Sequence, residues 1–225
     1  MEILIVCLVV TAIIGFILYN LYLSRAAIVT NKLHSIKTKS TNNIRDGDVV
    51  KIKGKIIYLG KTLIAPVSGK KCVGYHLYLE RNRRSIIDGY RTVGNWDDVI
   101  EEERYGDIII SIKKQYALID SKLVKSFISK DKEYTTGIRN LPILVTTLLK
   151  NRGHSPTNFY AEYDTITLKE GTLQQGETIV AIGKATWKYA IEINIKIPNE
   201  KILVISAADN EPVYFSDDSF ATSID

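Results

Sequence analysis

Cysteine, histidine and methionine are scarce in this chain, which has two cysteines, three histidines and one methionine in 225 residues. A structural zinc site needs four ligands, so the ligand set of a zinc finger or a RING domain is missing, and we predict no metal site. Cys7 and Cys72 lie too far apart in the sequence to suggest a disulfide framework. This cysteine usage fits a reducing compartment.

The short motifs that mark many enzymes are also absent. The sequence has no GxxxxGK[ST] phosphate loop, no GxGxxG after a predicted strand, no GxSxG and no HExxH. We therefore predict no cofactor and assign no catalytic residue. These absences weaken every enzymatic hypothesis without excluding one.

Charge is absent from residues 3–23, where most side chains are those of Ile, Leu, Val, Phe or Tyr. About 20 apolar residues in a helix match the hydrocarbon thickness of a bilayer. We predict a single transmembrane helix here, with the lipid bilayer as its partner. A cleaved signal peptide is an alternative, although Met1 and Glu2 supply no basic n-region. A buried core helix is another, although such helices are rarely apolar on every face.

Basic residues dominate the segment that follows the apolar run. Between residues 24 and 61 the chain has Arg25, Lys32, Lys37, Lys39, Arg45, Lys51, Lys53, Lys55 and Lys61 against Asp46 and Asp48. The positive-inside rule places the amino terminus outside and the remaining chain in the cytoplasm. These bases favour an anionic membrane surface. We do not expect a nucleic-acid partner, because no aromatic-rich or helix-turn-helix motif accompanies them.

Alternating apolar and polar residues after residue 46 predict many short strands. We expect them at 50–56, 72–81, 107–111, 115–120, 123–128, 158–168, 177–187, 190–197 and 202–206. Leu141 to Lys150 has helical spacing, with Pro142 in a first turn and Gly153 as a stop. The predicted fold class is α+β, mainly antiparallel β and barrel- or sandwich-like, with one helix in the domain.

The predicted organisation has four parts. Residues 1–23 form the transmembrane helix, 24–45 a juxtamembrane basic linker, 46–208 the mainly β domain, and 209–225 an acidic, mobile tail. The tail is expected to be mobile because its acids meet no base.

Two groups of residues carry candidate chemistry. Cys72 and His76 are four apart, so one face of a strand would hold a thiol and an imidazole together. No orienting third group is evident, and a buried cysteine beside a partly exposed histidine explains the pair as well. Arg81, Arg83 and Arg84 are candidates for binding an anionic group such as a lipid headgroup.

Several stretches resemble the GIDE domain, also called the beside-a-membrane (BAM-like) domain. The resemblance covers Gly54, the run over 63–75, the segment 116–120, the segment 168–183 and the final strand 201–206. The matching residues include Gly54, Pro66, Ser68, Gly69, Cys72, Asp120, Glu170, Gly176 and Gly183. GIDE domains occur in membrane-anchored mitochondrial E3 ubiquitin ligases and in short bacterial membrane proteins.

The resemblance implies a mainly β module that binds partners beside a membrane, here a bacterial inner membrane. Ubiquitin ligase activity is not implied, because this chain has no RING ligands. The first hypothesis is a non-enzymatic, membrane-anchored interaction module with an unknown protein partner. The alternatives are a cysteine-dependent hydrolase or transferase using Cys72 and His76, and a binder of anionic lipid or nucleic acid through basic patches.

Overall fold

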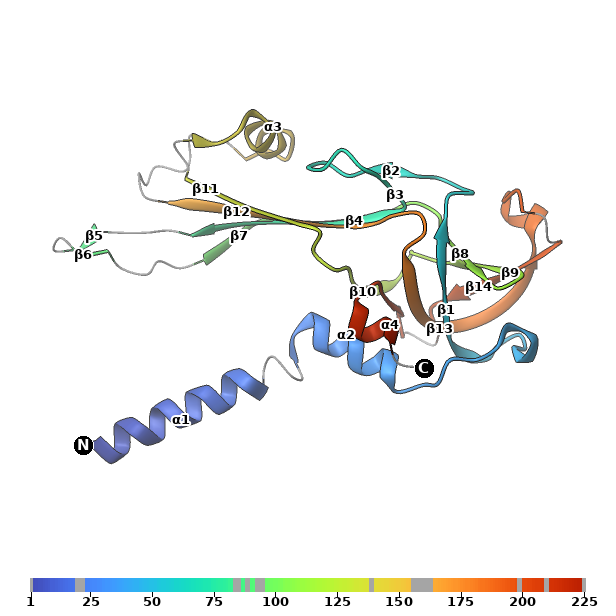
Figure 1. Cartoon of the computed structure of the whole chain (residues 1–225), viewed down its shortest axis with the longest axis horizontal. Coiled ribbons are helices and arrows are strands. Elements are labelled where there is room, and N and C mark those ends of the chain that lie inside the picture. The colour runs from blue at the N-terminus through green and yellow to red at the C-terminus, as the bar shows by residue number, and fades with distance from the viewer. Residues whose placement is uncertain are drawn as a thin grey trace. The chain divides into compact units, whose positions relative to one another are not determined.

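The computed structural model describes residues 2–18, 23–82, 86–87, 90–91, 96–137, 140–154, 164–197, 200–208 and 211–223. These residues are mostly in strands, with few helices (Figure 1). The chain divides into two units: unit 1 is Met1–Gly60, Asp107–Phe127 and Gly176–Asp225, and unit 2 is Lys61–Gly106 and Ile128–Gln175. The domain predicted over 46–208 is therefore divided, because each unit has its own sheet and its own apolar clusters.

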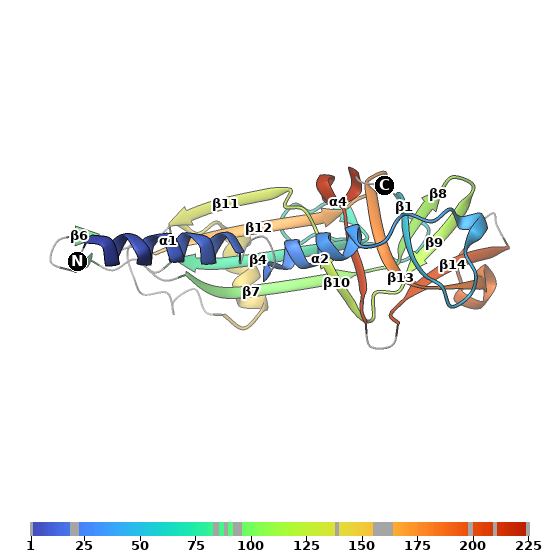
Figure 2. The same cartoon turned by 90° about the horizontal axis from the view of Figure 1, so that it is seen from below.

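Unit 1 contains a seven-stranded sheet (Figure 2). Its order is β1 (Val49–Ile57), β8 (Ile108–Ile112), β9 (Gln115–Ile119), β14 (Lys201–Ser206), β13 (Thr178–Tyr189), β15 (Val213–Ser216) and β10 (Val124–Phe127). β1 also pairs with β13, so the first five strands close into a barrel-like ring. The pairings β9–β14 and β10–β15 are parallel, and the others are antiparallel. The prediction of a mostly β, barrel-like fold is confirmed.

Strand β1 shows why these residues form a sheet. Val50, Ile52 and Ile56 alternate along the strand and are buried, whereas Lys55 on the other face is exposed. Gly54 shares the buried face, and a Cβ there would lie 2.6 Å from the backbone oxygen of Ser111 on β8. The close pairing of β1 with β8 therefore requires glycine at this position.

The linker predicted over 24–45 is wrong over much of its length, because it contains helix α2 (Arg25–His34) and the short 3₁₀ helix η2 (Thr41–Asn43). The Ser24 hydroxyl accepts a hydrogen bond from the Ala27 amide at 3.2 Å and caps α2. Val29 and Leu33, one helical turn apart, are buried in a cluster that includes Val180 of β13. This apolar pair holds α2 against the sheet.

The mobile acidic tail predicted over 209–225 is also wrong for the described residues 211–223. Val213 and Phe215 are fully buried in β15, which pairs with both β13 and β10. Helix α4 (Ser219–Ser223) follows, and the Asp218 carboxylate accepts hydrogen bonds from the Phe220 and Ala221 amides. Asp218 is therefore a helix cap. The alternation of the apolar Val213 and Phe215 determines that this segment forms a strand.

Helix α1 spans Glu2–Leu18, within the apolar run. Among the residues that the structure describes, none of the helices combines the length and the apolar content that crossing a bilayer requires. The transmembrane helix predicted over 1–23 is thus not supported by the structure. Residues 19–22 of the run lie outside the described residues.

Unit 2 contains a four-stranded antiparallel sheet. Its order is β11 (Lys132–Gly137), β12 (Thr165–Leu173), β4 (Gly74–Asn82) and β7 (Trp96–Tyr105), and the pairs β2 (Leu63–Ile64)–β3 (Lys71–Cys72) and β5 (Ile86–Ile87)–β6 (Tyr90–Arg91) accompany it. Helix α3 (Ile143–Asn151) corresponds to the predicted helix, and its Val145, Leu148 and Leu149 join the core of unit 2. Among the described residues of 46–208, α3 is the one α-helix, as predicted, and α2 and α4 lie outside these bounds.

Two local predictions differ from the structure. The strand expected over 190–197 is instead the 3₁₀ helix η5 (Ala190–Ile193), which ends at Asn194 in a left-handed conformation with φ of 55°. β13 therefore pairs with β14. The pair Glu170-Gly171 is a turn signal in the sequence and predicts a turn, but Gly171 lies inside β12, where a Cβ would come 2.3 Å from the backbone oxygen of Ser129. Glycine serves a close backbone approach there.

Candidate functional site

Cys72 and His76 lie in unit 2 but face different surroundings. Strand β3 ends at Cys72 and β4 begins at Gly74, with a bend at Val73 between them. The alternation of side chains between the two faces is therefore not continuous from Cys72 to His76. Cys72 is fully buried in the apolar cluster that includes Leu77. His76 points to the opposite face of β4, where its Nε2 lies 3.4 Å from a carboxylate oxygen of Glu101. The geometry gives no support to a thiol–imidazole catalytic pair.

The stretch over residues 66–69 and the distant Glu170 come together in unit 2. The two carboxylate oxygens of Glu170 accept hydrogen bonds from the Val67 amide at 2.8 Å and the Ser68 amide at 2.9 Å. Gly69 has φ of 69°, which favours glycine, and its amide bonds to Ala65 oxygen at 3.0 Å. The buried Glu170 carboxylate therefore stabilises the turn over residues 66–69. This role is structural, and it connects two of the stretches that resemble the GIDE domain.

The basic cluster expected at Arg81, Arg83 and Arg84 is only partly described. Arg81 Nε donates to a carboxylate oxygen of Asp164 at 2.7 Å, and this carboxylate is fully buried. The guanidinium group thus neutralises a buried charge within unit 2. Arg83 and Arg84 lie outside the described residues.

The remaining motif residues have backbone roles in unit 1. Asp120 directly follows β9 and accepts a hydrogen bond from the Lys122 amide at 3.1 Å. Gly176 has φ of 88° just before β13. Gly183 lies opposite Val50 in the β1–β13 pairing, where a Cβ would meet a side-chain carbon of Ile205 at 2.6 Å. Gly54 lies on β1, where the lack of a side chain allows the close approach of β8.

The strongest candidate site is a groove of about 790 Å³ in unit 1. We call it the lysine groove, after Lys37, Lys39, Lys53, Lys55 and Lys113. Its other lining residues are Thr38, Ser40, Thr41, Gly54, Ser111, Ile112 and Thr178. These residues come from the segment after α2, from β1, from the end of β8 with the turn after it, and from the start of β13. Among the described residues that line it, none is acidic and none is aromatic.

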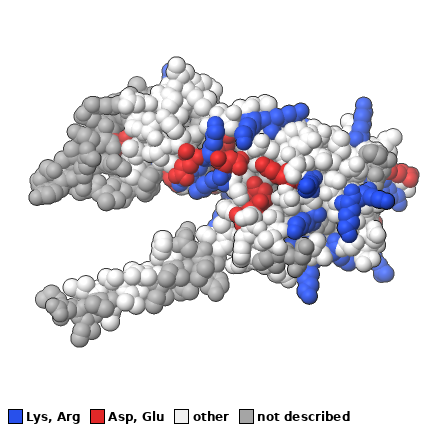
Figure 3. Space-filling view, viewed as in Figure 1, with Lys and Arg blue, Asp and Glu red and all other residues white. Residues whose placement is uncertain are grey.

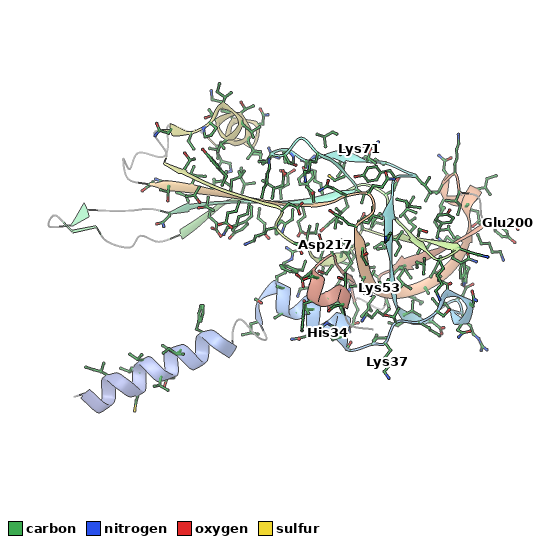
Figure 4. All side chains as sticks on the ribbon, viewed as in Figure 1. His34, Lys37, Lys53, Lys71, Glu200 and Asp217 are labelled. Atoms are coloured by element: carbon green, nitrogen blue, oxygen red, sulfur yellow. The ribbon has the colours of Figure 1, made fainter. Side chains whose placement is uncertain are left out.

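Local structure explains how the lysine groove is assembled. Lys53 and Lys55 are two apart on β1, so both project from the face opposite the buried Val50 and Ile52. The segment after α2 lies along β1, because the Lys39 amide bonds to Lys51 oxygen at 2.9 Å. Figure 4 labels Lys37 on that segment and Lys53 on β1. In Figure 3, blue basic side chains are numerous on the part of unit 1 that carries β1 and β8.

An ion pair fixes one wall of the lysine groove. Lys39 Nζ lies 2.6 Å from a carboxylate oxygen of Asp48, which also accepts from the Arg45 amide at 3.0 Å. The hydrogen bond from Lys39, and then that from Arg45, lower the pKa of the Asp48 carboxyl below its usual value. The Lys39 ammonium is thus anchored at the edge of the site.

Part of this site was visible in the sequence and part was not. The basic segment drew attention to Lys37, Lys39, Lys53 and Lys55, but as a linker against a membrane. Lys113 lies in the turn between β8 and β9 with φ of 55°, and it reaches the site only because β8 pairs with β1. The alternation of lysines with apolar residues on β1 was the available signal.

A second polar network lies in unit 2. Glu102 accepts hydrogen bonds from the Tyr75 hydroxyl at 2.6 Å and from Arg152 Nε at 2.5 Å, and Arg104 Nε lies 2.6 Å away. Burial, and then the hydrogen bond to Glu102, raise the pKa of Tyr75 to about 12. Burial raises the pKa of Glu102, but hydrogen bonds from Arg152 and Tyr75 outweigh it, so the net direction is downward. This network ties the end of α3 to β4 and β7.

The described residues contain no group of three or more His, Cys, Asp or Glu side chains placed to hold a metal ion. No family model matches this chain, and no curated protein and no solved structure matches it either. The resemblance to the GIDE domain therefore rests on the quoted residues alone.

Proposed function

We propose that this chain is a membrane-anchored interaction module without catalytic activity, attached by residues 3–23 and binding a partner at the membrane surface. The observation that carries the proposal is the exposure of large apolar side chains along α1. Leu8 is 64% exposed, Ile13 53% and Phe16 71%. Such a helix in water is unfavourable, because each large apolar side chain contributes about 1.5–3 kcal/mol when it is buried.

The bilayer is the environment that suits α1 best. The 17 residues of α1 carry no charge after Glu2. The wider apolar run over residues 3–23 carries no charge either, and about 20 apolar residues in a helix match the hydrocarbon thickness of a bilayer. Arg25 follows the apolar run and favours a cytoplasmic location for the two β units, at a bacterial inner membrane. The resemblance to GIDE domains supports a binding role, and ligase activity forms no part of the proposal.

Vesicle flotation tests this proposal. The full chain is mixed with phosphatidylcholine vesicles and centrifuged through a density gradient at high salt, which screens charge. We expect the chain to float with the vesicles and the double variant Leu8→Arg/Ile13→Arg to remain at the bottom, because charges inside a bilayer are costly. The matched control Lys122→Arg/Lys188→Arg changes exposed residues of unit 1 and should float. Flotation of the Arg variant, or no flotation of the original chain, would contradict the anchor.

A further inference from the structure

We infer that the lysine groove binds a ligand that carries more than one phosphate group. The ligand is either the headgroup of a phosphomonoester lipid or a soluble phosphoester of similar size. The inference deepens the proposed function by naming what unit 1 binds. It rests on the anchor only where the ligand is a lipid, because the groove is complete within unit 1.

The composition of the groove selects an anion. Five lysines from three chain segments line it, and among the described lining residues there is no acid. Lys39 is paired with Asp48 at the edge of the groove. Lys37, Lys55 and Lys113 are exposed, so they carry their charge at the mouth of the groove without a large desolvation cost.

Charge favours phosphate over carboxylate, because a phosphomonoester carries nearly twice the charge of a carboxylate. The cations of the described lining are all lysines. Lysine binds phosphate as a point charge. Hydroxyl groups of Thr38, Ser111 and Thr178 stand among the lysines and can donate to phosphate oxygens. One phosphomonoester carries a charge of roughly −1.5 to −2 at neutral pH, so lysines gathered from several segments suit more than one such group.

The size and lining of the groove favour a small ligand over nucleic acid. About 790 Å³ is in the usual range for sites that hold small molecules. Single-stranded nucleic acid is normally held by aromatic side chains that stack on the bases. The described lining has none. Residue 23 ends the proposed anchor, and only α2 and a short segment separate it from Lys37. This short connection to the anchor suits a lipid headgroup as the ligand.

Titration with tripolyphosphate tests the groove directly. The full chain in non-ionic detergent micelles is titrated by calorimetry, together with the double variant Lys55→Gln/Lys113→Gln. The matched control is Lys122→Gln/Lys188→Gln, which removes the same charge from exposed residues of unit 1 outside the groove. We expect the groove variant to bind about tenfold more weakly and the control to stay within about twofold, because each exposed ion pair contributes a factor of a few. All four substitutions are at exposed side chains, so circular dichroism should show no change in fold.

The result that would overturn the inference is equal binding by the original chain and the groove variant. An equal loss in the groove variant and the control would overturn it as well, because it would indicate general charge attraction. The absence of tripolyphosphate binding by the original chain would also overturn the inference. A single-stranded oligonucleotide that binds more tightly than tripolyphosphate, and is lost in the groove variant alone, would replace the phosphoester by nucleic acid.

A second arm separates the two sources of phosphate. The chain is placed in phosphatidylcholine nanodiscs that contain either diacylglycerol pyrophosphate, whose headgroup has two phosphates, or phosphatidylglycerol at the same total charge, and is titrated again with tripolyphosphate. A lipid headgroup in the groove predicts weaker tripolyphosphate binding in the discs that contain diacylglycerol pyrophosphate. A soluble phosphoester predicts equal affinity in both discs. A chain that fails to enter either disc would contradict the proposed anchor, and the micelle titration would still decide the groove.

Discussion

Glu170 offers a direct test of whether residues 66–69 are a structural turn. Its carboxylate accepts hydrogen bonds from the Val67 and Ser68 amides at 2.8 and 2.9 Å, and the side chain is 1% exposed. A hydrogen bond to a charged group contributes about 1.5–3 kcal/mol. The cost of burying the carboxylate offsets part of the two bonds. We therefore expect Glu170→Ala to lower the free energy of unfolding by about 3 kcal/mol.

Urea unfolding of the full chain, followed by circular dichroism, measures this loss. Glu133→Ala is the matched control, because Glu133 lies on β11 of the same unit and is exposed. The control should change the stability by less than about 0.5 kcal/mol. Hydrogen exchange at the Val67 and Ser68 amides should become faster in Glu170→Ala alone. A loss as small as that of the control, with unchanged exchange, would refute the structural role of the carboxylate.

Three further predictions concern stability. Gly54→Ala should lower the free energy of unfolding by about 2 kcal/mol, because the new Cβ would lie 2.6 Å from the β8 backbone. An unchanged midpoint of urea unfolding would contradict the close approach of β1 to β8. Phe215→Ala should lower the free energy of unfolding by about 3–5 kcal/mol, whereas Phe220→Ala, which is exposed and loses a ring contact with His34, should lower it by about 0.5–1.5 kcal/mol; unchanged stability in Phe215→Ala would indicate a mobile tail. The folded-state pKa of Tyr75 is raised from 10.0 to about 12, so the folded chain holds this proton more tightly and loses stability as pH rises from 10 to 12. Tyr75→Phe should remove that part of the pH dependence, and an identical slope in both chains would count against the network.

Local patterns in the sequence predicted the strands of unit 1 where one face is apolar. The alternation of Val50, Ile52 and Ile56 is visible without any partner, and β1 follows it. Val213 and Phe215 have the same spacing, yet the acids around them suggested a mobile tail. Net charge describes solvation and gives little information about pairing, so the strand pattern was the better guide there.

The candidate sites depended on contacts between distant parts of the chain. Cys72 and His76 have suitable spacing for one strand, but the break at Val73 separates their faces. Lys113 joins Lys55 at the groove through the β1–β8 pairing, in which Lys55 lies opposite Ser111. Sequence reasoning found the lysines of one segment because they are adjacent in the chain. It missed the site because register between non-consecutive strands is set by packing.

Membrane attachment through residues 3–23 is the claim on which the proposed function depends. Alkaline carbonate extraction of membranes from cells that express the full chain tests it most directly, because this treatment releases proteins held by charge and retains those embedded in lipid. The account predicts that the chain stays in the membrane pellet and that Leu8→Arg/Ile13→Arg appears in the supernatant. Release of the original chain into the supernatant would contradict the account.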